Sequence, residues 1–337
     1  MRIDRSRSAF RVLVVVAAAS AALAACSSGG GASNQGGGSG GTASGGANTS
    51  GSNLTFAMIT HEQAGDTFWD KIRAGAEDAA KAHGITLNYS NNENGPEQAT
   101  LVQNAIDSKV SGIAVTLSNA DAVIPVTQKA VAAGIPVVAF NQGITDYKRA
   151  GAKMYFGSDE TLAGKTIGQK LAQDDPGGKT LCVIQAQGSV ALEARCAGVK
   201  SGYASTENLQ VNGADLPSVQ ATLQSKLAED KSITNIVTLG APIALAAQQA
   251  EQSAGSTAKI VTFDLNQDAA QAIKDGKIAF AVDQQPYVQG YQSVLMLWMN
   301  ITNGNDLGGG GPVLTGPSIV DKTNIDQILP YTKNNRR

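Results

Sequence analysis

The sequence predicts an α/β protein with two lobes, each built around a parallel sheet. From Leu54 onward, short apolar segments of strand length alternate with amphipathic segments of helical period. The alternation runs to Phe140, starts again at Lys153, and is followed by one long helix near the end. Apolar strands separated by helices are typical of parallel sheets that are covered on both faces. The restart predicts two such units in one chain.

The first unit is expected to contain four strands with helices between them. We expect strands at 56–59, 85–89, 112–117 and 135–140, and helices at 68–83, from 96 onward and at 121–133. Gly84 and Gly134 follow the first and third of these helices, where a left-handed residue commonly ends a helix. Pro96 stands in the first turn of the second helix, where the N–H that proline lacks is not needed.

The second unit repeats this order and ends in an extended tail. We expect strands at 153–156, 180–185, 209–213, 235–239, 260–263 and 278–282, and helices at 160–173, 192–205, 218–228, 243–254, 267–274 and 287–301. A glycine loop at 308–311 then leads to a tail that ends in Val320.

The N-terminal segment has the features of an export signal. Arg2, Arg5, Arg7 and Arg11 give it a basic start, and an apolar run over residues 12–25 follows. The run is too short to span a bilayer comfortably as a permanent helix. Residues 1–25 are therefore expected to be a signal peptide.

Cys26 follows Leu23-Ala24-Ala25, an arrangement that resembles the lipobox of bacterial lipoproteins. The resemblance implies that Cys26 is lipidated and anchors the chain to the outer face of the cell membrane. An ordinary signal peptide with an incidental cysteine is the alternative, and the position of Cys26 where the apolar run ends favours the lipobox. Residues 26–53 consist mainly of Gly, Ser, Ala, Asn and Thr, which is typical of a flexible tether.

The composition of the body, Leu54–Arg337, excludes several classes of function. The formal net charge of the whole chain, −2, argues against nucleic acid as a partner. The glycine runs lack the Gly-Lys-Ser/Thr of a phosphate loop. Neither His61 nor His83 stands in a metal-binding or triad spacing, so we expect no metal and no cofactor. Cys182 and Cys196 are either a disulfide, as export allows, or two small buried side chains.

Polar and aromatic residues follow several of the predicted strands. They are Asp66, Phe68 and Trp69, then Asn141 and Gln142, then Asp264, and finally Asp283, Gln284 and Gln285. Ligands of open parallel sheets bind outside the carboxyl ends of the strands. Carboxylates and amides bridge adjacent hydroxyls, and aromatic rings cover the C–H face of a sugar or polyol. The set is therefore suited to a polyhydroxylated ligand.

These residues belong to motifs that resemble the ribose/galactose-type periplasmic sugar-binding proteins of ATP-driven uptake systems, which have the type I periplasmic binding protein fold. The resemblance covers about residues 54–322. The motifs that carry it are Gly65–Trp69, Ile135–Val138, Leu192–Gly198, Val261–Asp264, and Asp283–Pro286 with Gly290. Their order and spacing together are specific, although no single motif is decisive.

The resemblance implies a discontinuous chain path with three crossings between the lobes. The crossings are expected near Gly157, near Gln285 and around 314–317. One lobe then comprises residues 54–156 plus 286–313, and the other comprises residues 157–285 plus 314–331. The ligand is expected in the cleft between them.

The resemblance also implies a role for each site residue. Asp66 would come from the first lobe with Phe68 and Trp69, whose rings would stack on the ligand. Arg195 would donate to a ring oxygen or paired hydroxyls, and Asp264 would accept from two hydroxyls. Gln284 would bind the ligand near the hinge.

Two pairs of adjacent residues depart from the family pattern. Asn141-Gln142 replaces an Asp-Arg pair, and Gly240-Ala241 replaces an Asn-Asp pair. The changes remove charge and two polar side chains. We therefore expect Asn141 and Gln142 to serve a ligand with fewer or differently placed hydroxyls, such as a sugar alcohol.

The function expected from these features is that of a solute-binding lipoprotein, active as a monomer, that passes its ligand to the permease of an ABC importer. A receptor of the same ligand class that feeds a signalling partner is the main alternative. An enzyme acting on glycosides through Asp66 and Asp264 is less favoured. A repressor with this body fold would need an N-terminal helix-turn-helix, and a signal peptide and tether stand there instead.

Overall fold

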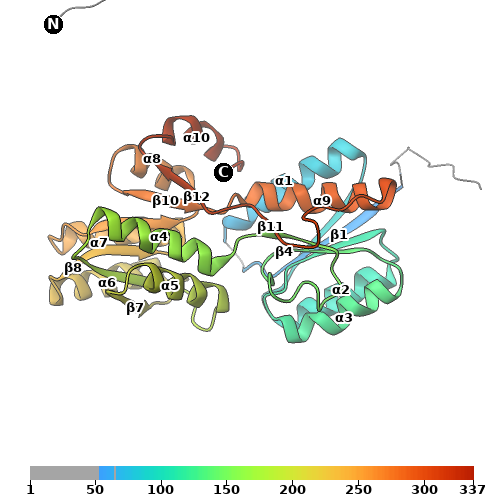
Figure 1. The fold of residues 1–337 in the computed structure, drawn as a ribbon, viewed down its shortest axis with the longest axis horizontal. Coiled ribbons are helices and arrows are strands. Elements are labelled where there is room, and N and C mark those ends of the chain that lie inside the picture. The colour runs from blue at the N-terminus through green and yellow to red at the C-terminus, as the bar shows by residue number, and fades with distance from the viewer. Residues whose placement is uncertain (1–52, 64–65) are drawn as a thin grey trace, which may run out of the picture. The chain divides into compact units, whose positions relative to one another are not determined.

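The computed structural model describes residues 53–63 and 66–337, so the signal peptide, Cys26 and nearly all of the tether lie outside the described residues. Within this part of the chain the structure contains two six-stranded sheets with helices packed on them (Figure 1). No helix in the described ranges has both the length and the apolar character to cross a membrane. The two α/β units predicted from the alternation of strands and helices are present.

The first sheet is entirely parallel, with the strand order β11-β5-β4-β3-β1-β2. Its strands are β1 (Thr55–Thr60), β2 (Thr86–Asn91), β3 (Gly112–Val115), β4 (Val137–Asn141), β5 (Met154–Gly157) and β11 (Val313–Leu314). Alternate residues of β1 point into different cores: Phe56 and Met58 pack with the helices of one face, and Ala57 and Ile59 with those of the other.

The helices of this unit lie on both faces of the sheet (Figure 1). One face carries α1 (Phe68–His83) and α9 (Pro286–Asn303), and the other carries α2 (Gly95–Asp107) and α3 (Ala120–Ala132). Helix α1 ends at Gly84 in the left-handed conformation, φ 64°, and Gly134 beyond α3 has φ 82°. Both glycines therefore serve the helix ends as predicted.

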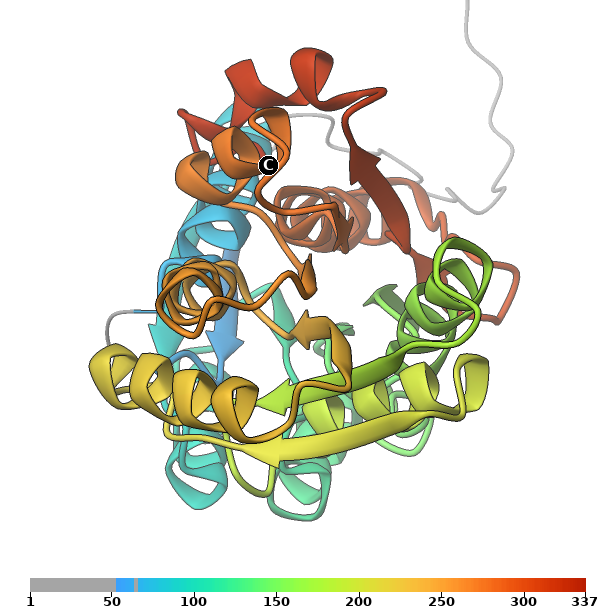
Figure 2. The ribbon, with the colours of Figure 1, turned by 90° about the vertical axis from the view of Figure 1, so that its left-hand side faces the viewer.

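The second sheet has the order β12-β10-β9-β8-β6-β7 and is parallel except for β12, which pairs antiparallel with β10. Its strands are β6 (Lys179–Ile184), β7 (Thr206–Gln210), β8 (Ile233–Thr238), β9 (Lys259–Phe263), β10 (Phe280–Asp283) and β12 (Ser318–Asp321). Figure 2 views the molecule from the side of this sheet.

Helices also cover both faces of the second sheet. They are α4 (Glu160–Asp174) and α5 (Val190–Gly202) on one face, and α6 (Leu216–Glu229), α7 (Ala241–Ser253) and α8 (Gln267–Lys274) on the other, with α10 (Ile325–Thr332) packed on α8. Asp159, Ser189, Asp215 and Asn266 cap α4, α5, α6 and α8 through their side chains. These caps fix the helix starts that face the carboxyl ends of the strands.

The chain passes from one sheet to the other three times. It does so between β5 and α4, between β10 and α9, and between β11 and β12. The lobe limits predicted from the family, and the use of these segments as hinges, remain predictions.

Three elements differ from the sequence expectations by three or more residues or were not expected. Helix α5 ends at Gly202 and not at Ser205, because Tyr203 is extended and its hydroxyl donates to the carbonyls of Asp175 and Gly178.

Strand β7 begins at Thr206, three residues before the expected start, because it is an edge strand whose polar Asn208 and Gln210 face solvent. The expected end at Gly213 is a turn in which Asn212 accepts a hydrogen bond from the N–H of Ala214. Helix α10 was not expected, since it is short and contains Pro330.

Candidate functional site

Three residues at strand ends adopt the left-handed conformation without being glycine. Asn141 at the end of β4 has φ 61°, Asp264 after β9 has φ 61°, and Gln285 after β10 has φ 56°. Such conformations are uncommon and gather at ligand-binding positions, where the surrounding structure holds them. They mark the carboxyl ends of strands from both sheets.

A buried hydrogen-bond network joins these strand ends. Asn141 Nδ2 donates to Gln289 Oε1 at 3.1 Å and to Gln284 Oε1 at 3.4 Å. Gln284 Nε2 donates in turn to Asp264 Oδ2 at 3.0 Å. Gln289 Nε2 also donates to Gln284 Oε1, and to Thr315 Oγ1 between β11 and β12. The network thus connects the end of β4 in the first sheet to the ends of β9 and β10 in the second.

Arg195 lies beside the same carboxylate, on helix α5. Its Nη1 is 3.8 Å from Asp264 Oδ2, its Nε donates to Glu160 Oε2, and its Nη1 also donates to the carbonyl of Leu239 at 3.3 Å. The guanidinium carbon stands 4.5 Å from the centre of the Phe263 ring. Only 6% of Arg195 is exposed, so these contacts replace water around a buried cation.

The carboxylate of Asp264 is the electrostatic centre of the site. Burial raises the pKa of Asp264 to about 7, with Arg195 opposing the shift and Asp283 adding to it. Its Oδ1 is buried and has no hydrogen-bond partner among the described residues. A buried acceptor of this kind is costly unless a donor reaches it, and a ligand hydroxyl can do so.

The predicted aromatic residues open helix α1. Trp69 is buried in the core, and its ring meets those of Phe68 and His61 edge-on, with centroids 5.4 and 4.7 Å away. Phe68 is the more exposed of the predicted pair. Asp66 is exposed, and its carboxylate accepts a hydrogen bond from the N–H of Phe68 at 3.0 Å. This contact stabilises the first turn of helix α1.

The polar side chains of Asp66 and Gln142 form no hydrogen bond to this network and no ion pair or hydrogen bond to Arg195 within the described ranges. The main chain of Gln142 binds Phe140 and Leu117. The structure therefore brings together Asn141, Gln284, Asp264 and Arg195, and leaves Asp66 and Gln142 at the margin.

Several polar residues around this site were not singled out from the sequence. Glu160 and Gln289 contact predicted residues directly, as described above. Lys71 on α1 is only 4% exposed; burial lowers its pKa, while Asp264 and Asp283 oppose the shift. Its position three residues after Phe68, on the same face of the helix, is the signal that could have identified it.

His61 and Thr116 form a second polar pair at the ends of β1 and β3. His61 Nδ1 lies 2.8 Å from Thr116 Oγ1, which also accepts from Gln98 Nε2 at 2.9 Å. Burial lowers the pKa of His61 to about 4, so the ring is neutral at physiological pH. Their places directly after strands could have drawn attention to them in the sequence.

Comparison with known proteins assigns the fold and its family. The model of the periplasmic binding protein domain matches residues 56–306. The chain belongs to the periplasmic binding protein family. The family and the type I fold that the motifs predicted are therefore confirmed.

Curated relatives of this periplasmic binding protein are distant in sequence. The ribose import binding protein of Escherichia coli is 26% identical over 254 residues, which cover 73% of this chain and 83% of that protein. The xylose/arabinose-binding protein of Sulfolobus acidocaldarius is 26% identical over 242 residues, 67% of this chain and 60% of that protein.

One solved structure is considerably more similar. The carbohydrate transporter from Acidothermus cellulolyticus, crystallised with myo-inositol, is 51% identical with a TM-score of 0.81, and the match covers 84% of this chain and 99% of that one. A solute-binding protein from Burkholderia graminis in complex with D-arabinose has a TM-score of 0.72 at 22% identity, which shows the shared fold alone.

Proposed function

We propose that this protein is the solute receptor of an ABC importer and that it binds a cyclitol, myo-inositol in the first place. The observation that carries the proposal is the buried Asp264, whose Oδ1 has no partner in the described part of the chain while Arg195 stands beside its Oδ2. The 51% identical protein crystallised with myo-inositol supports the choice of ligand.

The chemistry of the site suits a cyclitol. Every ring carbon of myo-inositol bears a hydroxyl that can both donate and accept, and no ring oxygen or anomeric carbon is present. Asp264 would accept from hydroxyls, Arg195 would donate to them, and the amides of Asn141 and Gln284 can do both. Phe68, with Trp69 beside it, would cover the C–H face of the ring.

Ligand capture would use both lobes, one comprising residues 54–156 plus 286–313 and the other residues 157–285 plus 314–331. Asn141 belongs to the first sheet, whereas Arg195 and Asp264 belong to the second. A ligand held by both groups stabilises the arrangement in which they are close and thereby shifts an open–closed equilibrium. That arrangement would be recognised by the permease, and the protein would perform no catalysis.

The anchoring of the receptor is proposed from the N-terminal sequence. Lipidation of Cys26 would retain the protein at the outer face of the cell membrane, and residues 27–53 would tether the binding body to the lipid. Intact mass measurement of membrane-extracted protein would show the acyl chains. A Cys26→Ser variant is expected to lose them, and an unacylated wild type would overturn this part of the proposal.

Calorimetric titration tests the ligand directly. We expect myo-inositol to bind wild type more tightly than ribose, arabinose, xylose, allose or galactose. Asp264→Asn should weaken binding about 100-fold, since it removes a charged acceptor, and the exposed control Asp306→Asn should not change it. Tight binding of an aldose alone, without myo-inositol, would overturn the cyclitol assignment.

A further inference from the structure

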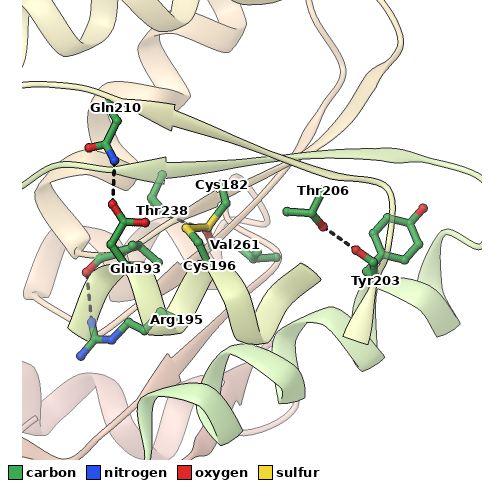
Figure 3. Close-up of a disulfide and its surroundings, with 10 residues drawn as sticks. Cys182, Glu193, Arg195, Cys196, Tyr203, Thr206, Gln210, Thr238 and Val261 are labelled. Carbon is green, nitrogen blue, oxygen red and sulfur yellow. Dashed lines mark hydrogen bonds between the residues drawn. A yellow bond between two sulfur atoms is a disulfide. The ribbon is translucent and has the colours of Figure 1, made fainter. Parts of the chain in front are cut away.

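A disulfide lies next to the arginine of the site. Cys196, the residue that follows Arg195 in α5, is bonded to Cys182 in β6, with their Cα atoms 5.9 Å apart (Figure 3). Both cysteines are fully buried. Strand β6 is hydrogen-bonded on both sides, to β7 and β8. The bond therefore ties the arginine-bearing turn of α5 to a strand that is itself held within the sheet.

The other side of α5 is fixed by main-chain contact with α4. A Cβ added at Gly164 would lie 2.0 Å from the carbonyl oxygen of Arg195, and one at Gly198 would lie 2.3 Å from that of Thr161. Glycine at these positions lets the two backbones touch. The turn that carries Arg195 is thus clamped between β6 and α4.

The same helix pair supplies the partner that orients the arginine side chain. Glu160, in the first turn of α4, accepts from Arg195 Nε, and the guanidinium packs over Phe263 beside Asp264. A long side chain with several rotatable bonds loses considerable conformational entropy when it is fixed. A rigid support fixes it before the ligand arrives, so less conformational entropy is lost on binding.

We propose that the Cys182–Cys196 disulfide is a positioning element for ligand binding, acting through Arg195. The inference rests on the proposed function, because it takes Arg195 to be a ligand contact. The sulfur atoms themselves do not touch the ligand. They hold the backbone of α5 where the guanidinium meets both Glu160 and Asp264, and loss of the bond weakens ligand binding in the folded protein.

A double-mutant cycle separates this role from a general effect on stability. In the Cys182→Ala/Cys196→Ala variant we expect myo-inositol to bind about tenfold more weakly by calorimetry, within the range of couplings between contacting residues. In an Arg195→Lys background the same pair of changes should alter affinity less than about twofold. Leu227→Ala, in the other core of the second sheet, is the control that lowers stability while leaving the affinity unchanged.

The affinities measured in this cycle show whether the disulfide positions Arg195 for ligand binding. Equal effects of the cysteine changes in the wild-type and Arg195→Lys backgrounds, that is, an additive cycle, would overturn the positioning role, as would unchanged affinity without the disulfide. Wild type that does not bind myo-inositol would overturn the proposed function and this inference with it. If the alanine pair does not fold, Cys182→Val/Cys196→Ala and wild type refolded in dithiothreitol provide the same comparison.

Discussion

At the level of single residues, Asp264 is expected to couple the proposed ligand binding to protons. Its pKa is raised to about 7 because the carboxylate is buried, and the ionised form is the one that accepts hydroxyl hydrogens without donating any. Ligand binding should therefore favour ionisation, and the affinity should fall by up to about tenfold for each pH unit below 7. Titrations with myo-inositol from pH 5.5 to 8, in two buffers with different ionisation heats, would measure the affinity and the protons released.

The control for this dependence is Asp264→Asn, whose weaker binding should be independent of pH. His61 does not interfere, because its pKa of about 4 keeps it neutral over the range. A wild-type affinity that stays constant from pH 5.5 to 8 would contradict the proposed role of the Asp264 carboxylate.

His61 should make the folded protein sensitive to acid. The folded pKa of about 4 lies below the ordinary value of 6.5, so between these limits the unfolded chain binds more protons. The stability that neutral His61 supports is complete above pH 6.5 and declines as the pH falls toward 4, by at most about 3 kcal/mol. Asp264 acts in the opposite direction, since a raised carboxyl pKa favours folding at lower pH.

Comparison with His61→Asn separates the two contributions. Urea unfolding at pH 7, 5.5 and 4.5 should show wild type losing stability relative to the variant as the pH falls, because only wild type carries the partly buried imidazole with its lowered pKa. A difference between the two proteins that does not change with pH would show that His61 is not held neutral by burial.

At the level of elements, glycine sets the distance between helices α1 and α9. A Cβ at Gly290 would lie 2.0 Å from the carbonyl oxygen of Ile72, and one at Gly75 would lie 2.1 Å from that of Tyr287. Gly290→Ala must push the helices apart and is expected to lower the free energy of unfolding by about 2–3 kcal/mol. Gly177→Ala is the matched control, because no heavy atom lies within 4 Å of its added Cβ.

The stabilities of the Gly290→Ala and Gly177→Ala variants are compared by the midpoint of urea unfolding, monitored by circular dichroism. A Gly290→Ala protein as stable as the Gly177→Ala control would mean that α9 shifts at little cost, contrary to the close packing of the two backbones.

The elements themselves were largely predictable because their signals are local. The helix at 68–83 follows from its period and from Gly84, and its observed bounds are the expected ones. Edge strand β7 and helix α10 were less accessible. The position of β7 depends on pairing with β6, and α10 depends on packing against α8, neither of which is encoded in the local pattern.

The site followed the same division between local and distant information. Asn141, Asp264 and Gln284 were predicted because each stands just after a predicted strand, and ligands of parallel sheets bind at the carboxyl ends of the strands. Glu160 and Gln289 stand on helices, and their contacts depend on how those helices rotate and pack on the sheets. The family motifs could supply Arg195 but not its partner on α4.

At the level of the whole molecule, residues 336 and 337 connect elements that belong to different sheets. Arg337 Nε lies 2.8 Å from Asp283 Oδ2, and its Nη1 donates to Gln285 Oε1 at 2.9 Å, at the end of β10. Arg336 contacts Asp78 on α1 and packs over the ring of Tyr287 on α9. In Figure 1 this end of the chain lies between α10 and α1.

The pair formed by Arg337 and Asp283 should therefore affect stability and binding together. Asp283 is fully buried; burial raises its pKa and Arg337 opposes the shift. Arg337→Gln removes the cation that contacts this carboxyl, on which Lys71 also acts, and should lower the free energy of unfolding by about 1–3 kcal/mol. It should also weaken myo-inositol binding severalfold, because contacts between the two sheets favour the arrangement that holds the ligand.

The pH dependence of the loss identifies its cause. A carboxyl with a raised pKa destabilises the fold when it ionises, so the deficit of Arg337→Gln should be larger at pH 8 than at pH 5, because protonation of Asp283 increasingly relieves the charge as the pH falls. Arg149→Ala, which removes an exposed arginine paired only at the surface, should change stability by less than about 1 kcal/mol at either pH. A deficit of equal size at both pH values would show that Arg337 acts through packing, and unchanged affinity would show that its contacts do not contribute to ligand capture.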